Sequence, residues 1–139
     1  MRTVLIAAMS LFVITSAAQA AAPVTGKWVT AERDSIVEIG QCGTHVCGHV
    51  LRLSIKAADG KPMLDRNNPD PGLRTRPIQG LTILTDFSDG GANWTGRIYD
   101  PKSGKSYKSY LSRNPDGTLK VQGCVATFLC RTFTWTPAR

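Results

Sequence analysis

The chain has 139 residues and carries 17 basic against 10 acidic residues, a formal net charge of +7. This length suits one domain with one hydrophobic core and leaves no room for two. The basic residues are spread along the chain rather than gathered in a block or interleaved with aromatic residues, which excludes the usual pattern of a nucleic-acid-binding protein.

The first twenty residues have the order of a secretory signal peptide. Arg2 is followed by an apolar run from Val4 to Ile14 and by small residues ending in Ala18-Gln19-Ala20. This is the charged, apolar and A-x-A order of a cleavable signal, and the run is too short to cross a hydrocarbon layer of ~30 Å as a helix. We predict cleavage after Ala20, a single domain over residues 21–139 with no transmembrane segment, and a location in the periplasm or outside the cell.

Beyond the signal, polar and apolar residues alternate with period two between frequent turn residues, which is typical of antiparallel β-strands. Eight short strands joined mostly by hairpins lose their exposed edges when they close into a barrel. We predict an all-β, eight-stranded antiparallel up-and-down barrel, with a two-sheet β-sandwich as the alternative. Such a barrel is either just filled by side chains or holds one small ligand. The predicted strands cover residues 25–31, 36–39, 45–55, 78–85, 92–99, 106–113, 119–125 and 129–136.

The four cysteines fall into two close pairs, Cys42 with Cys47 and Cys124 with Cys130. An oxidising compartment favours disulfides over free thiols. Three connectivities are possible, and we predict the two local bridges because each pair brackets an expected hairpin turn.

One connection, residues 56–77, is too long for a hairpin. Structureless loops of this length in compact domains are usually functional or disordered. Its prolines and the turn-forming run Asn67-Asn68-Pro69-Asp70 favour an ordered excursion. We expect this loop to lie over or beside the barrel mouth.

Two arginines in this loop are candidates for ligand binding. Arg74 and Arg76 are two positions apart, so in an extended segment both guanidinium groups point to one side and can clamp a carboxylate or phosphate. The alternative is structural, with the arginines paired to Asp65 or Asp70 to lock the loop. The full set of candidate ligand contacts is Asn68, Asp70, Arg74, Arg76, Trp94 and Tyr99.

Two groups of metal-ligand residue types occur, and neither has the spacing of a known site. In a calcium loop starting at Asp65, Asp70 stands where glycine is required and Arg76 where glutamate is required. His45 and His49 lie among cysteines at a spacing unlike the common zinc modules. The chain has no G-x-S-x-G motif and no recognisable catalytic pair of carboxylates. We expect no metal, no cofactor and no catalytic residues.

The run Gly26-Lys27-Trp28 at the start of the first expected strand resembles the G-x-W signature of lipocalins and other calycin barrels. In those proteins the tryptophan closes one end of the barrel under a basic side chain from near the C-terminus. The resemblance implies that Gly26 and Trp28 close this barrel, with Arg131 or Arg139 as the basic residue.

Longer segments extend the resemblance over nearly all of the chain after the signal. They run from Gly26 to Trp28, Cys42 to Gly48, Asn68 to Gly80 and Tyr99 to Tyr107, and end with Trp135-Thr136. Together they resemble the exported bacterial family called domain of unknown function 2147. Pro137 stands where that family has an arginine, and the family supplies no activity.

These observations favour a periplasmic lipocalin-like module, not an enzyme, that binds a small apolar or amphipathic ligand. The expected partners are a small apolar or anionic amphipathic ligand and an envelope component, and an anionic partner suits the basic protein. The alternative is an envelope-associated protein-interaction module with a filled barrel and no ligand, and an enzyme acting on envelope material ranks third. An interior cavity of a few hundred cubic ångströms would distinguish the first two.

Overall fold

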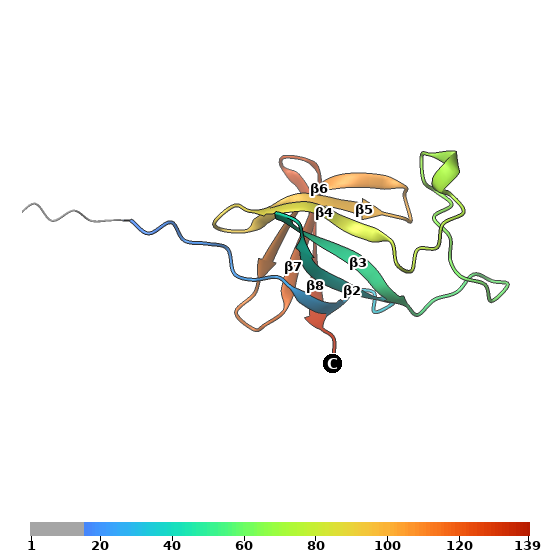
Figure 1. Ribbon diagram of the computed structural model, residues 1–139, viewed down its shortest axis with the longest axis horizontal. Helices are drawn as coiled ribbons and strands as arrows, with labels where there is room; N and C mark the ends of the chain where they lie inside the picture. The colour runs from blue at the N-terminus through green and yellow to red at the C-terminus, as the bar shows by residue number, and fades with distance from the viewer. Residues whose placement is uncertain (1–15) are drawn as a thin grey trace, which may run out of the picture.

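Eight antiparallel strands, each paired with its neighbour in the sequence, form a closed up-and-down barrel in which the last strand returns to pair with the first (Figure 1). The computed structural model describes residues 16–139, so the charged and apolar parts of the predicted signal peptide lie outside the described residues. The predicted fold class is confirmed. The strands are β1 Gly26–Val29, β2 Ser35–Cys42, β3 His45–Leu53, β4 Thr82–Asp89, β5 Trp94–Asp100, β6 Lys105–Arg113, β7 Leu119–Ala126 and β8 Leu129–Pro137.

The fourth strand begins four residues later than predicted. Residues 78–81 are used in a turn, in which the N–H of Leu81 donates to the carbonyl of Ile78 and the N–H of Gly80 donates to the carbonyl of Val50. Gly80 has a φ of 90°, a conformation that glycine adopts at little cost. The apolar residues Ile78 and Leu81 therefore pack from a turn rather than from a strand.

The barrel interior is filled by side chains. A Cβ added to Gly48 would lie 2.8 Å from Leu84, and one added to Gly96 would lie 2.6 Å from the Phe87 ring. Both Leu84 and Phe87 are fully buried, so the two glycines leave the space that these large side chains occupy. The buried cluster consists of Val24, Trp28, Val37, Ile39, Val46, Val50, Leu81, Ile83, Leu84, Phe87, Leu111, Leu119, Val121 and Trp135.

One end of the barrel is closed by Trp28, which is 1% exposed. Its indole N–H donates to the carbonyl of Val24 at 3.0 Å, and the guanidinium of Arg113 lies 4.6 Å from the centre of its ring. The expectation that Arg131 or Arg139 would cover this tryptophan was wrong. Arg113 pairs with Leu119, which pairs with Trp135, whereas Arg131 pairs with Gly123 four residues further from this end.

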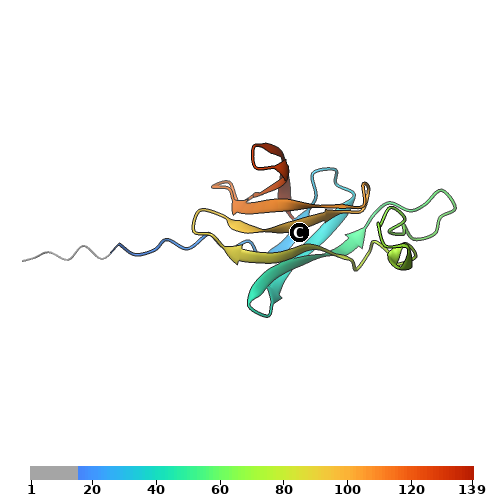
Figure 2. The same ribbon diagram turned by 90° about the horizontal axis from the view of Figure 1, so that it is seen from above.

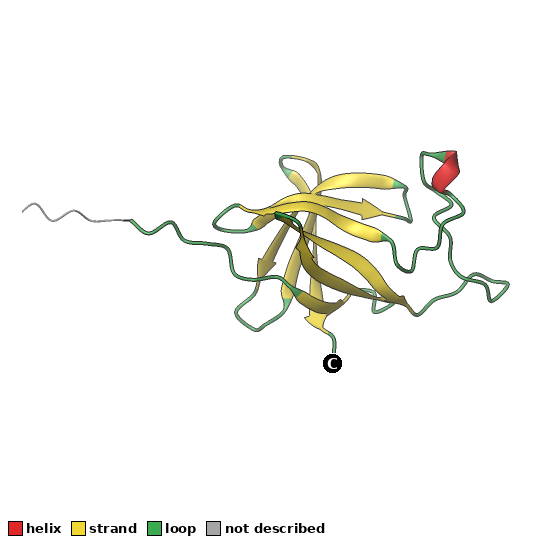
Figure 3. Ribbon diagram, viewed as in Figure 1, coloured by secondary structure: helices red, strands yellow, loops and turns green. Residues whose placement is uncertain are grey.

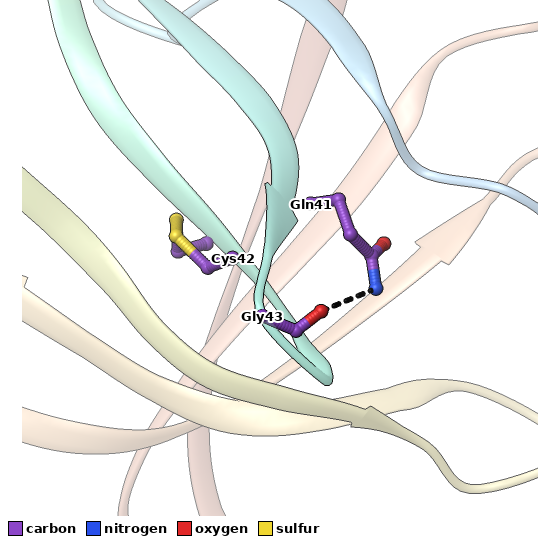
Figure 4. Close-up of a disulfide and its surroundings, with 4 residues drawn as sticks. Gln41, Cys42 and Gly43 are labelled. Atoms are coloured by element: carbon purple, nitrogen blue, oxygen red, sulfur yellow. Dashed lines mark hydrogen bonds between the residues drawn. A yellow bond between two sulfur atoms is a disulfide. The ribbon is translucent and has the colours of Figure 1, made fainter.

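Both predicted disulfides are present. Cys42–Cys47 spans the β2–β3 hairpin, where the side-chain amide of Gln41 also donates to the carbonyl of Gly43 at 3.2 Å (Figure 4). Cys124–Cys130 spans the β7–β8 hairpin. Each bridge joins two strands close to their turn, as expected for pairs that bracket a hairpin.

The chain between β3 and β4 extends away from one side of the barrel (Figures 1 and 2). It carries a short 3-10 helix, η1 Pro71–Leu73, drawn in red in Figure 3. Over residues 16–139, no helix has the length and apolar character needed to cross a membrane.

Candidate functional site

The long loop is ordered by its own backbone hydrogen bonds. Leu64 and Pro77 form an isolated antiparallel bridge, flanked by hydrogen bonds from the N–H of Asp65 to the carbonyl of Arg76 at 3.0 Å and from the N–H of Ile78 to the carbonyl of Met63 at 2.9 Å. The two ends of the loop are thereby held together. The long loop, which its prolines predicted to be ordered, is a closed substructure.

The carboxylate of Asp65 lies at the centre of this loop and is fully buried. Its Oδ1 accepts a hydrogen bond of 2.6 Å from the Tyr99 hydroxyl on β5. Its Oδ2 accepts from the Asn68 amide at 2.8 Å and from the guanidinium of Arg76, with Nε at 2.9 Å and the second nitrogen at 2.8 Å. A buried carboxylate is tolerated only when it is paired and hydrogen-bonded, as it is here.

This environment shifts the protonation of both acidic groups. Burial alone would raise the pKa of Asp65, but the hydrogen bonds from Tyr99 and Asn68 and the positive charge of Arg76 outweigh it and lower that pKa. The pKa of Tyr99 is raised, first by burial and then by its hydrogen bond to the Asp65 carboxylate and the negative charge of that group. Asp65 is therefore held as the anion.

The loop is also fixed to the β5–β6 hairpin. The side-chain amide of Asn67 donates to the carbonyls of Lys102 at 2.8 Å and Pro101 at 3.3 Å. Gly104 is buried in the same turn with a φ of 69°, and a Cβ there would overlap the backbone carbonyl of Asn67. Two segments singled out in the sequence, residues 68–80 and 99–107, are thus parts of one interlocked structure.

An open pocket of about 540 Å³ lies beside this structure, on the outer face of the barrel. A Cβ added to Gly123 on β7 would contact Ile98 on β5 across the barrel, so Ile98 points inward. Because side chains alternate along a strand, its neighbours Arg97 and Tyr99 point outward, and the pocket lies on the outer face. The pocket combines two arginines with four hydroxyl groups. Its lining residues are Asn68, Pro69, Arg76, Thr82, Thr85, Arg97, Tyr99, Gly104 and Ser106.

The structure brings together three of the six candidate ligand contacts, Asn68, Arg76 and Tyr99. The other three have structural contacts. Arg74 donates to the carbonyl of Asn68 at 2.7 Å, Asp70 caps η1 by accepting from the N–H of Gly72 at 2.9 Å, and Trp94 donates to the carbonyl of Ala22 at 2.9 Å.

Of the two arginines, Arg76 pairs with a carboxylate, that of Asp65, and the hydrogen bonds of Arg74 go to backbone carbonyls. The pairing of Arg76 with Asp65 agrees with the structural reading of this loop, whereas Arg74 is held by backbone carbonyls rather than by Asp65 or Asp70.

Sequence reasoning missed Arg97, which is exposed and lines the pocket. Only its place in the strand register, opposite Thr85 on β4 and Lys108 on β6, reveals it. The alternation of side chains along the predicted strand places Arg97 on a polar face, but the sequence does not show which loop lies beside that face.

Neither histidine lines this pocket, but His49 on β3 is opposite its lining residue Thr82 in the strand register. His49 lies 3.5 Å from Glu38, and the ring of His45 is 3.1 Å from the Thr44 hydroxyl. In the part of the chain that the structure describes, no three His, Cys, Asp or Glu side chains gather in a way that could hold a metal ion.

The family model described as "Uncharacterized protein conserved in bacteria (DUF2147)" matches residues 26–137, and the chain belongs to this family. A solved structure with the same fold is described as protein HP1028 from the human pathogen Helicobacter pylori, which belongs to the lipocalin family. It is 25% identical to this chain, the match covers 84% of each chain, and the TM-score is 0.72. No curated protein matches the chain. The barrel is therefore lipocalin-like.

The contact between loop and hairpin predicts unequal effects for two glycines in hairpin turns. Gly104→Ala should destabilise the domain by about 2 to 4 kcal/mol, since it combines left-handed strain with a clash against Asn67. Gly117→Ala is the matched control, because Gly117 also has a positive φ but a Cβ there meets open space, so its cost should be about 1 kcal/mol. Denaturant unfolding with the disulfides intact measures both values, and equal losses would contradict the docking of the loop.

The lowered pKa of Asp65 predicts an acid-sensitive loop. A group whose pKa is lower in the folded state contributes stability that is fully present above its unfolded pKa, about 3.9, and is lost as the pH falls through the folded value. Pepsin should therefore begin to cut residues 56–77 only as the pH falls below about 4. Asp65→Asn should be cut across the whole acidic range, whereas Asp59→Asn, at an exposed site, should behave like the wild type.

Proposed function

On this family membership and lipocalin-like barrel, we propose that the protein is an exported, non-enzymatic binding module for a small amphipathic molecule with an anionic head group. The ligand binds in the pocket between the long loop and the outer face of β4, β5 and β6, not inside the barrel. The observation that carries the proposal is the lining of this pocket, which holds two guanidinium groups and hydroxyl donors beside a filled barrel.

The two arginines have different roles in this proposal. Arg76 is held by Asp65, and its side chain is still 37% exposed, so it can present its remaining N–H groups to the pocket. The side chain of Arg97 makes no ion pair within residues 16–139, and Arg97 is therefore the cation available to an incoming anion. Charge-assisted hydrogen bonds from such groups to a carboxylate or phosphate are roughly twice as strong as neutral ones.

A second open pocket supports an amphipathic ligand rather than a simple anion. It shares Arg97 and Ser106 with the first and has a volume of about 520 Å³. Its other lining residues are Lys105, Lys108 and Thr127 together with Tyr107, Cys124, Val125 and Ala126. A molecule with its head group at Arg97 would find apolar surface in this second pocket.

The alternative, a protein-interaction module, is favoured by the same filled barrel and by the ordered loop. In that case the loop surface binds a protein, and the pocket holds no small molecule. Export is common to both proposals, and the two disulfides are compatible with it because they persist in oxidising compartments.

Native mass spectrometry of the protein purified from its own cell envelope tests the ligand. We expect an adduct that disappears on denaturation, and Arg97→Gln should reduce its occupancy about tenfold because one charge-assisted hydrogen bond is lost. Arg52→Gln, at an exposed position on β3, is the control and should keep the adduct. A wild-type protein with a clean mass would favour the interaction module.

The contacts of Ala21 support cleavage after Ala20. Ala21 is 8% exposed, and its N–H donates to Asp89 Oδ1 at 3.0 Å. This bond and one from the N–H of Gly91 lower the pKa of Asp89, so the carboxyl is anionic. Cleavage would turn the Ala21 nitrogen into an ammonium group within reach of this carboxylate, which would anchor the new N-terminus by an ion pair.

This anchoring predicts a difference in chemical reactivity. In the protein processed by a bacterial host, an amine-reactive ester should label residue 21 more slowly than in Asp89→Asn, because the carboxylate keeps the amine protonated and covered. Asp59→Asn serves as the control. Peptide mass mapping reads out the labelled site, and an N-terminus at any other residue would refute the predicted cleavage.

A further inference from the structure

The most exposed apolar side chains in the described part of the chain lie together at the β7–β8 hairpin. Phe128 is 87% exposed, Val125 64% and Leu129 59%, whereas the other exposed large apolar residues reach at most 43%. We call residues 125–129 the hairpin tip. No charged residue occurs between Cys124 and Cys130, and contiguous exposed apolar surface of this kind marks an interaction site.

The tip projects from the barrel at the end opposite the C-terminus (Figure 1). The disulfide Cys124–Cys130 joins its two strands at the base. A cross-linked hairpin holds its apex side chains outward at little further cost in conformational entropy on binding. The apex therefore presents its apolar groups as a preorganised unit.

Basic side chains surround the base of the tip. Lys108 is opposite Cys124 in the strand register and Arg97 is opposite Lys108. Arg97, Lys108 and Lys105 line the second pocket, and none of its lining residues is acidic. The same pocket is also lined by Val125, Ala126 and Thr127 of the hairpin tip. Arg131 follows Cys130 on β8. An apolar apex ringed by cations complements a lipid layer, in which apolar chains lie beneath anionic head groups.

We propose that the hairpin tip docks the protein on an anionic lipid surface, with Phe128, Val125 and Leu129 entering the interface and Lys105 and Lys108 contacting head groups. This docking goes beyond the ligand binding proposed above and is tested without a ligand, but the two share Val125, Lys105 and Lys108, which also line the second pocket. It would place the shared wall of the two pockets, Arg97 and Ser106, next to the lipid.

Flotation with vesicles tests this docking on the protein exported and processed by a bacterial host. The wild type should float with vesicles of phosphatidylcholine and phosphatidylglycerol, and much less with phosphatidylcholine alone or at high salt, because salt screens the attraction. Phe128→Ser should weaken binding about tenfold. Leu73→Ser removes an exposed leucine from the long loop and should bind like the wild type.

Charge variants test the head-group contacts. Lys105→Gln and Lys108→Gln should each weaken binding about fivefold, whereas Lys56→Gln in the long loop should weaken it less. Thermal unfolding should change little in these variants, because the substituted side chains are exposed, with only Lys108→Gln losing a contact, that of its ammonium group with the Tyr110 ring at 5.4 Å. Wild-type protein that stays with the unbound fraction, or Phe128→Ser that floats like the wild type, would overturn the proposal.

Phe128→Trp distinguishes a lipid surface from a second copy of the chain. Its emission should shift to shorter wavelength when anionic vesicles are added and should not depend on protein concentration without them. A shift that grows with protein concentration alone would show that the tip pairs with another copy, and the lipid proposal would then be wrong.

Discussion

Closure of the sheet between β1 and β8 is the constraint on which the rest of the structure depends. The ladder is short, with Trp28 opposite Pro137 and Val29 opposite Thr136, yet it turns eight strands into a barrel of fixed circumference. Eight strands enclose a space that side chains can just fill. Trp28, Leu84 and Phe87 fill it here, and the pocket beside the long loop lies on the outer face of the barrel.

The long loop on the outer surface of the barrel is held in place by one buried charge, the carboxylate of Asp65. Asp65 is far from Tyr99 in the sequence, and their hydrogen bond fixes the long loop on β5. The network would be costly if any partner were missing, because a buried carboxylate without its hydrogen bonds is strongly unfavourable. This explains why the segments at residues 68–80 and 99–107 carry so many polar residues, glycines and prolines. Residues from both segments build the wall of the pocket.

The two proposed functions share one side of the molecule. Arg97 and Ser106 belong to both pockets, and the second pocket reaches the base of the hairpin tip. A binding module that docks on lipid through this tip would hold its ligand site at the lipid surface. An amphipathic molecule would then have a short path between the lipid layer and the protein.

Period-two alternation and turn chemistry predicted the number and order of the strands, because both depend on neighbouring residues. The disulfides were predictable for the same reason, since each joins cysteines across one turn. The predictions were wrong where a strand boundary or a side-chain contact depends on residues that are far apart in the sequence. Ile78 and Leu81 look like strand residues, but their backbone groups bond to the turn and to β3. The resemblance to lipocalins implied a C-terminal arginine over Trp28, whereas the strand register places Arg113 there.

The sequence by itself determined an all-β chain with eight strands, two local disulfides and an ordered proline-rich loop. Only the tertiary structure decided that the barrel is filled, that Arg76 pairs with Asp65 while Arg74 binds backbone carbonyls, and that Arg97 lines the pocket. Local patterns fix which face of a strand is apolar. The volume that closure encloses and the partner of a buried charge depend on residues brought together from distant parts of the chain.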